Sequence, residues 1–206
     1  MVNIGGLVKF SVIDYPGKVS AVVFTQGCNF SCPFCHNPEL VLPEKFAACI
    51  TEEEVFGFLK KRRGKIEGVV VTGGEPTIQD GIIPFLRQIR EMGYFIKLDT
   101  NGTNPGILEE VIHCCLVDFI AMDIKAPFEK YHILSGVKVD TDKINESINI
   151  ILRSGLDYEF RTTFVSSLLS DEDISQIKAL LGSDKRYRVQ EFVMQEDIVS
   201  PEKLRG

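Results

Sequence analysis

The sequence contains no tryptophan, only three histidines and no run of 18 or more apolar residues. Without such a run there is no candidate for a transmembrane helix of ordinary length. The first ten residues include one lysine and two adjacent glycines, and they lack the charged start and apolar stretch of a secretory signal. We therefore expect a cytoplasmic protein without a membrane span.

Basic residues are also in deficit. The formal net charge is −6, because 29 acidic residues outnumber 23 lysines and arginines. This balance argues against nucleic-acid binding, which normally uses a basic surface. The five basic residues within positions 60–65 follow three glutamates at 52–54 in one predicted helix, where acids at the start and bases at the end complement the helix dipole. We expect this basic cluster to be the solvated face of that helix.

Apolar strands alternate with helices along the whole chain, which indicates an α/β fold. The predicted strands are 19–25, 68–72, 94–100, 117–124, 158–165 and 186–193, and the predicted helices are 51–63, 80–92, 105–114, 142–153 and 171–181. Near-continuous apolar strands separated by helices predict a parallel sheet with the helices outside. A closed eightfold barrel needs about 250 residues. Six units therefore predict one domain, residues 1–206, built as an open, partial (β/α)6 barrel, with residues 1–18 as an N-terminal extension before the first strand.

Three of the six cysteines, Cys28, Cys32 and Cys35, lie directly after the first predicted strand. In parallel α/β folds active sites form at this end of the strands. Three thiolates can hold three irons of a [4Fe-4S] cluster and leave the fourth iron open for a ligand. A zinc site with His36 and a c-type haem on Cys32-Pro-Phe-Cys35-His36 are the alternatives. The short spacing disfavours zinc, and haem attachment would leave Cys28 unused.

The other three cysteines are scattered. A cytosolic protein is not expected to form disulfides, and free cysteine is often buried. We therefore expect Cys49, Cys114 and Cys115 to pack in the core or to have no role. Cys49 is the only one near the cluster in sequence, so it is the fourth ligand that a non-enzymatic iron–sulfur carrier or zinc module would need.

The Cys-x3-Cys-x2-Cys spacing resembles the signature of the radical S-adenosylmethionine enzymes. The resemblance implies a catalytic [4Fe-4S] cluster on Cys28, Cys32 and Cys35, with the amino and carboxylate groups of S-adenosylmethionine on the open iron. It also implies reductive cleavage to a 5′-deoxyadenosyl radical that abstracts a hydrogen atom. In such a system the cofactor supplies the chemistry, while the protein binds and orients it.

Further motifs follow the later strands. They read Val71-Thr-Gly-Gly-Glu-Pro76, Asp99-Thr-Asn-Gly102 and Met122-Asp-Ile-Lys125. The resemblance implies that Gly73, Gly74 and Glu75 bind the methionine amino group, that Asn101 and Lys125 contact S-adenosylmethionine, and that Phe34 and His36 flank its adenine. It implies a monovalent cation at Asp99, Thr100, Met122 and Asp123.

Three positions keep alternatives open from the residues alone. Asp99 and Asp123 end neighbouring predicted strands, so the pair needs a cation, which is either Lys125 or a bound alkali ion. Arg161 lies inside the fifth predicted strand, where it binds a ligand carboxylate or forms a structural ion pair. Gln190 stands near the point where pyruvate formate-lyase activators have a histidine that contacts S-adenosylmethionine.

The cysteine segment with Cys35-His-Asn37 is most similar to activating enzymes of glycyl-radical enzymes. Asp14-Tyr-Pro-Gly17 and Gln190-Glu-Phe192 resemble the activators of anaerobic ribonucleoside-triphosphate reductase. The resemblance implies that this reductase is the partner, that Asp14 contacts its glycine loop, and that flavodoxin or ferredoxin is the electron donor. The alternatives are an activator of pyruvate formate-lyase or another glycyl-radical enzyme, and a radical enzyme acting on a small molecule such as a deazapurine precursor.

Overall fold

The computed structural model describes residues 1–182, 186–195 and 197–204. The strands are β1 Ile4–Ser11, β2 Ser20–Thr25, β3 Gly68–Gly73, β4 Phe95–Thr100, β5 Phe119–Asp123, β6 Asp157–Phe164 and β7 Tyr187–Glu191. The helices are α1 Pro38–Val41, α2 Glu52–Arg62, α3 Ile82–Glu91, α4 Pro105–His113, α5 Tyr131–Ser135, α6 Thr141–Arg153 and α7 Asp171–Leu180. Short 3₁₀ turns are η1 Pro43–Lys45, η2 Pro76–Ile78, η3 Phe128–Lys130 and η4 Pro201–Leu204. None of the helices in the described part is long and apolar enough to cross a membrane.

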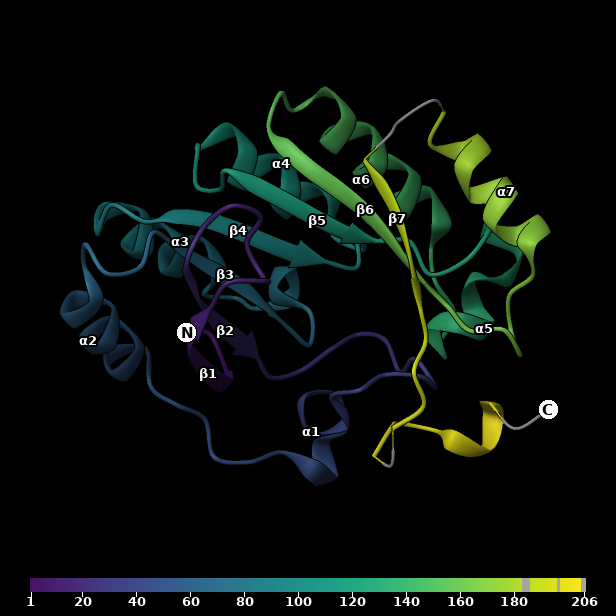
Figure 1. Cartoon of the computed structure of the whole chain (residues 1–206), viewed down its shortest axis with the longest axis horizontal. Helices are drawn as coiled ribbons and strands as arrows, with labels where there is room; N and C mark the ends of the chain where they lie inside the picture. The colour runs from purple at the N-terminus through teal and green to yellow at the C-terminus, as the bar shows by residue number, and fades with distance from the viewer. Residues whose placement is uncertain (183–185, 196, 205–206) are drawn as a thin grey trace.

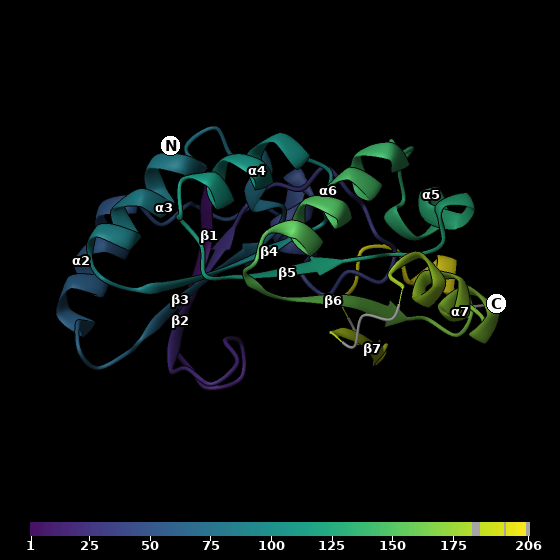
Figure 2. The ribbon, with the colours of Figure 1, turned by 90° about the horizontal axis from the view of Figure 1, so that it is seen from above.

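The seven strands form one open sheet in chain order (Figure 1). Strands β2 to β7 are parallel, which confirms the predicted open α/β architecture. Helices α3, α4 and α6 lie along one face of this sheet (Figure 2). Strands β1 and β7 are the two edges of this sheet and do not pair with each other in the described part of the chain, so the sheet stays open between them. The face opposite the helices carries the pocket described below. We call this opposite face the lumen.

The N-terminal segment differs from the prediction. Residues expected to be an extension form β1, which pairs antiparallel with β2 and adds a seventh strand at the edge. The prediction failed because adjacent glycines, Gly5 and Gly6, weaken the sequence signal for a strand. The same glycines suit the position, because a Cβ on Gly5 would lie 2.4 Å from the side chain of Leu40.

The predicted helix boundaries agree with the structure to within two residues. Helices α2 and α7 both begin with a capping box, in which Thr51 and Ser170 accept from a backbone N–H three residues later. Gly93 takes a φ of +85° just after α3, a conformation that favours glycine. These helices pack on alternate, buried residues of the strands, and the main apolar core therefore lies on the helix side of the sheet.

The lumen is layered along the strands. At its N-terminal end, Val22, Val70 and Phe119 form a separate small apolar cluster with Tyr15, whose ring is 6.1 Å from that of Phe119. Tyr15 belongs to the turn that joins β1 to β2, so this turn closes the lumen floor. Above the floor the inward side chains become charged and polar, and this change locates the functional site at the C-terminal ends of the strands.

Candidate functional site

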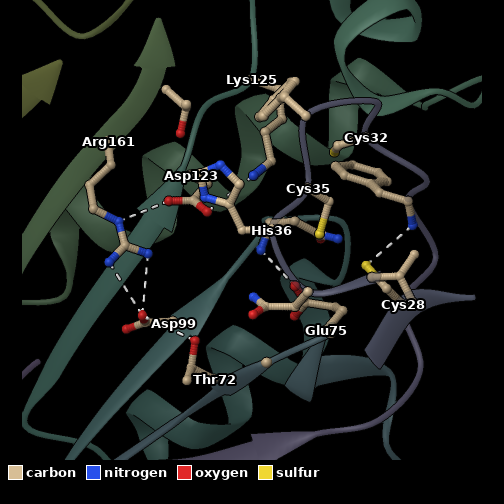
Figure 3. A pocket seen from close by; sticks show the side chains of 18 of the residues that line it. Cys28, Cys32, Cys35, His36, Thr72, Glu75, Asp99, Asp123, Lys125 and Arg161 are labelled. Atoms are coloured by element: carbon tan, nitrogen blue, oxygen red, sulfur yellow. Dashed lines mark hydrogen bonds and ion pairs between the residues drawn. The ribbon is translucent and has the colours of Figure 1, made fainter. Parts of the chain in front are cut away.

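A pocket of about 300 Å³ lies at the C-terminal ends of the parallel strands (Figure 3). It brings together almost all of the predicted site residues. Those that line it are Cys28, Cys32, Phe34, Cys35, His36, Gly73, Gly74, Glu75, Asp99, Thr100, Asn101, Asp123, Lys125, Arg161 and Gln190. Met122 and Asp14 do not line it. Segments far apart in sequence therefore converge here, as the shared strand-end positions predict.

The cysteine loop follows β2 and is pinned on several sides by its backbone. Gly27 N–H donates to the Leu40 carbonyl at 2.8 Å, and Ser31 N–H donates to the Ser135 carbonyl at 2.8 Å. Cys32 is 7% exposed, whereas Cys28 and Cys35 are half-buried. The loop thus holds three free thiols at one end of the pocket.

The arrangement fits an iron–sulfur cluster better than a single metal ion. In the described residues, no three His, Cys, Asp or Glu side chains converge closely enough to hold one ion. The geometry of the described residues therefore gives no support to the zinc alternative on the three cysteines and His36. In a cubane cluster each thiolate binds a different iron, so thiols that share one pocket without meeting at one point suit a cluster.

Burial sets the reactivity of these thiols in the cluster-free protein. It raises the pKa of Cys28 to about 12 and the pKa of Cys32 to about 11, and it raises the pKa of Cys35 as well. Cluster binding needs thiolates, so assembly must release protons from these side chains. The other cysteines, Cys49, Cys114 and Cys115, are exposed, so the expectation that they pack in the core is wrong.

This contrast predicts an order of alkylation. In cluster-free protein at pH 8, iodoacetamide should label the exposed Cys49, Cys114 and Cys115 first and the three pocket cysteines later, because only the thiolate reacts and burial raises the pKa of the pocket thiols. Labelling of Cys32 should rise about tenfold for each pH unit below its pKa. Peptide mass spectrometry over time gives the order, and equal rates for all six cysteines would contradict the burial argument.

Two glycines after β3 let two loops approach closely. Gly73 has a φ of +109°, and a Cβ on Gly74 would lie 2.0 Å from the carbonyl oxygen of Gly27. The Glu75 N–H donates to this same carbonyl at 2.9 Å. The Gly-Gly pair is therefore required to hold the strand-end loop against the base of the cysteine loop.

We expect Gly74→Ala to destabilise the fold by about 1–3 kcal/mol, because the clash is with backbone and cannot be relieved by a rotamer change. Gly57→Ala is the matched control, since Gly57 lies in α2 with no atom within 4 Å of an added Cβ. Alanine there should stabilise by about 0.5–1 kcal/mol. Urea unfolding of both variants measures the difference, and equal midpoints would show that the loops can separate freely.

The Glu75 carboxylate does not project into the pocket as a free group. It is buried and accepts four hydrogen bonds, from Thr77 N–H at 3.0 Å, Thr77 Oγ1 at 2.6 Å, Thr100 Oγ1 at 2.7 Å and Asn101 N–H at 2.6 Å. These bonds join the loops after β3 and β4. The side chain of Glu75 therefore positions these two loops, and its contact with a ligand stays a prediction.

Asn101 connects the β4 loop to the cysteine loop. Its Nδ2 donates to Asn29 Oδ1 at 2.8 Å, and its Oδ1 accepts from the Thr103 hydroxyl at 2.7 Å. Asn29 in turn donates to the Thr103 hydroxyl at 2.8 Å. Asn29 and Thr103 were not identified from the sequence. Their positions could have pointed to them, because Asn29 lies inside the cysteine motif and Thr103 directly follows the Asn101-Gly102 turn.

Arg161 bridges the paired carboxylates (Figure 3). Its Nε is 2.8 Å from Asp123, and both terminal nitrogens are 3.3 Å from Asp99. Lys125 adds a 3.1 Å ion pair to Asp123. The cation that the carboxylates require is thus provided by side chains. Lys97, which the sequence analysis missed, adds a 2.5 Å pair to Asp99 although it interrupts an apolar strand.

These ion pairs fix the charge states of the lumen. Burial alone would raise the pKa of Asp123, but Arg161 and Lys125 outweigh it and hold this pKa well below its ordinary range. The same pairing raises the pKa values of Lys125 and Arg161 despite their burial. Met122 is fully buried on the helix side, and its side chain packs against Gly102. Only its backbone could therefore contribute to a cation site.

An aromatic group closes the pocket beside the cysteines. His36 stacks on Phe192, with ring centroids 5.2 Å apart, and its Nε2 is 3.0 Å from the Val193 carbonyl. Phe34 meets the edge of Phe192 at 6.2 Å. Gln190, on β7, is exposed and lines the same side. The predicted adenine-flanking residues therefore share this wall with Phe192, which the sequence analysis had used only as a subgroup marker.

A late segment, residues 197–204, braces the cysteine loop from outside. Val199 N–H donates to the Cys35 carbonyl at 3.3 Å, and Ser200 N–H donates to the Pro33 carbonyl at 3.0 Å. Ile198, the residue directly before these two contacts, is buried in the main core. The loop is thus held by backbone bonds on two opposite sides.

Asp14 lies away from the pocket. It belongs to the turn between β1 and β2, at the opposite end of β2 from the cysteine loop, and its carboxylate accepts a hydrogen bond from the Ser11 hydroxyl. It borders the lumen floor formed by Tyr15. A contact between Asp14 and a partner therefore has to come from the floor side.

Comparison with known proteins supports one superfamily. A family profile described as Radical SAM superfamily matches residues 22–182. The Methanocaldococcus jannaschii protein named "Putative glycyl-radical enzyme activating enzyme MJ1227" is 38% identical over 92% of this chain and 79% of its own length. The pyruvate formate-lyase-activating enzyme of Clostridium pasteurianum is 31% identical over 61% of this chain and 53% of that protein.

A solved structure supports the same fold. Streptococcus suis SuiB bound to S-adenosylmethionine superposes with a TM-score of 0.65 at 18% identity, over 84% of this chain and 40% of that chain. The present chain thus spans about two fifths of the SuiB chain. At this identity the similarity demonstrates the partial-barrel fold, and the inference of activity depends on the site itself.

Proposed function

The chain belongs to the radical SAM superfamily, and we propose that it activates a glycyl-radical enzyme by abstracting a hydrogen atom from a glycine of that partner. The observation that carries the proposal is the combination of three free thiols at the head of the pocket with a sheet that stays open between its edge strands β1 and β7. The thiols suit the cofactor, and the open sheet leaves a path by which a protein loop would reach it.

Cys28, Cys32 and Cys35 would hold the [4Fe-4S] cluster, since they are free and share one pocket. When bound and reduced, the cluster supplies the electron that cleaves S-adenosylmethionine. Lys125 and Asp123 present charges of both signs beside the cysteines, which suits the carboxylate and amino groups of a methionine moiety. Asp123 pairs with both Lys125 and Arg161, and these ion pairs keep the charged groups ionised and oriented before the ligand arrives.

Other parts of the wall would bind the rest of the ligand. Phe34 and His36 offer the aromatic surface for the adenine, with Gln190 at its rim as a polar contact. The backbone at Gly73 and Gly74 lies open to the pocket because these residues carry no side chain. The proposal also includes a monovalent cation at Asp99, Thr100, Met122 and Asp123. Arg161 and Lys97 already balance its carboxylates.

We propose anaerobic ribonucleoside-triphosphate reductase as the partner, on the basis of the Asp14-Tyr-Pro-Gly17 and Gln190-Glu-Phe192 motifs. Asp14 at the lumen floor would meet the glycine loop, and flavodoxin or ferredoxin would donate the electron in the cytoplasm. Pyruvate formate-lyase or another glycyl-radical enzyme is the alternative partner within the same reaction class.

The charged lumen favours a second candidate function, a radical reaction on a small molecule. Lys97, Asp99, Glu159 and Arg161 form an ion-pair network that could contact a polar substrate. A 7-carboxy-7-deazaguanine synthase of Rhodopirellula baltica is 36% identical over 45% of this chain. Because these ions already pair with one another, a substrate would have to replace existing bonds, which makes this candidate the weaker one.

One anaerobic experiment tests both. Reconstituted and reduced protein is mixed with S-adenosylmethionine and the candidate reductase, while 5′-deoxyadenosine is followed by mass spectrometry and the glycyl radical by electron paramagnetic resonance. We expect both products. 5′-Deoxyadenosine without a glycyl signal would reject this partner and favour the small-molecule reaction. Neither product, with a fully loaded cluster, would favour an iron–sulfur carrier.

A further inference from the structure

The outer edge of β1 is an unpaired sheet edge beside the lumen opening. In the part of the chain that the structure describes, only Ile50 bridges to this edge, at Ile4. From Gly6 to Ser11 the edge carries no further strand. Such an edge presents a row of backbone donors and acceptors that can pair with an added strand.

The two sides of this edge differ in chemistry. On the lumen side, Val8 lies opposite Val22 of the floor cluster and is 43% exposed. The strand has a register shift between Val8 and Ser11, and around and beyond it the apolar residues Phe10, Val12 and Ile13 are 63%, 62% and 86% exposed. We call Val8, Phe10, Val12 and Ile13 the apolar strip. Large apolar side chains exposed together at the end of one strand are unusual on a surface that only faces water.

The helix side of the same edge is basic. A groove of about 800 Å³ runs between β1 and α2. Its charged lining residues are Lys9, Lys61, Arg62 and Lys65, against the single acid Glu54. Arg62 lies over the ring of Phe58 at 5.6 Å, so the groove also has an apolar base. Four cations gathered in one groove of a chain with net charge −6 indicate an acidic occupant.

We propose that an extended acidic segment of the partner glycyl-radical enzyme adds to the free edge of β1 while its glycine loop enters the lumen. Because side chains alternate along a strand, residues of this segment on one side would meet Val8 and Phe10 and should be apolar. Those on the other side would meet Lys9, Lys61 and Arg62 and should be Asp or Glu. The inference rests on the proposed function and names the docking surface that function needs.

The basic helix offers a matched pair of variants for the test. Lys61 and Arg62 line the groove, whereas Lys60 and Arg63 point to a separate surface hollow beside Tyr94. K61E/R62E and K60E/R63E change the net charge equally, on the same last turn. We expect K61E/R62E to weaken binding of the holoenzyme to anaerobic ribonucleotide reductase about tenfold at low salt, and the control by less than about twofold.

The apolar strip is tested by Phe10→Ser, and Ile133→Ser is its control. Ile133 is a 44% exposed apolar residue of α5, away from β1. Binding is measured by anaerobic biolayer interferometry, together with partner-free formation of 5′-deoxyadenosine, which none of the variants should change. Equal weakening by both double variants, or no weakening by either groove or strip variant, would overturn the docking surface. Normal binding by the wild type without any glycyl radical would instead overturn the proposed function and leave the surface intact.

Discussion

Cys32→Ala should lower 5′-deoxyadenosine formation below about one thousandth of the wild-type rate, because the protein without its cluster retains no group able to supply the electron. Cys32 is the most buried of the three thiols, and its loop is fixed by the Ser31 bond to Ser135. No other thiol of the described residues lines the pocket besides Cys28 and Cys35. Iron and sulfide analysis after reconstitution should show loss of the cluster.

Cys114→Ala is the matched control. Cys114 is an exposed thiol just after α4, outside the pocket, so its removal should leave cluster content and turnover unchanged. Circular dichroism of both cluster-free variants separates ligand loss from misfolding. If Cys32→Ala kept full S-adenosylmethionine cleavage, the assignment of the ligands would be wrong.

Arg161→Ala should destabilise the protein by about 3 kcal/mol, because removal of one partner leaves buried carboxylates without their cation. Asp99 has 15% of its side chain exposed and depends on Arg161 and Lys97, whereas Asp123 is 35% exposed and keeps Lys125. The destabilisation by Arg161→Ala should therefore be smaller than the largest values observed when one partner of a buried ion pair is removed. Arg87→Ala, on the exposed side of α3, should cost at most about 0.5 kcal/mol.

The contribution of Asp123 to the pH dependence of stability should be larger in the wild type than in Arg161→Ala. In the wild type its pKa lies below the unfolded value, so its stabilising contribution is present above about pH 4 and is lost as the pH falls further. Without Arg161, burial should raise the pKa of Asp123 relative to that in the wild type. The stability difference between the two proteins should therefore shrink as the pH falls below about 4 in urea titrations, because the wild type loses the contribution of ionised Asp123 there. A constant difference would show that Arg161 acts through packing alone.

The sequence predicted the parallel part of the fold well because β2 and β3 are nearly continuous apolar runs and β4 to β6 keep buried apolar residues at alternate positions. Strands β2 to β7 and the longer helices were found by periodicity, caps and stop signals. Strand β1 was missed for the opposite reason: it is an edge strand with two glycines and a half-exposed pattern. Strand β1 is stabilised by its antiparallel pairing with β2, and a local sequence pattern does not reveal such pairing.

The sequence indicated which residues gather at the candidate site better than it indicated what their side chains contact. Motifs at the ends of neighbouring parallel strands lie close together, so most of the predicted residues line one pocket. What each side chain touches depends on distances across loops. Glu75 was expected at the ligand, yet its carboxylate is fully used by Thr77, Thr100 and Asn101. The sequence left open whether Arg161 binds a ligand carboxylate or forms an ion pair, and the structure shows ion pairs with Asp99 and Asp123.

The brace on the cysteine loop has a consequence for how the protein is made. Synthesis proceeds from the N-terminus, so the three cysteines leave the ribosome long before residues 197–204 that hold Cys35 and Pro33 from outside. A chain that has been synthesised only as far as the strands therefore lacks the two backbone bonds that hold the cysteine loop from outside. Docking of residues 197–204 adds these bonds, so the loop reaches its final geometry only after this late part of the chain is in place.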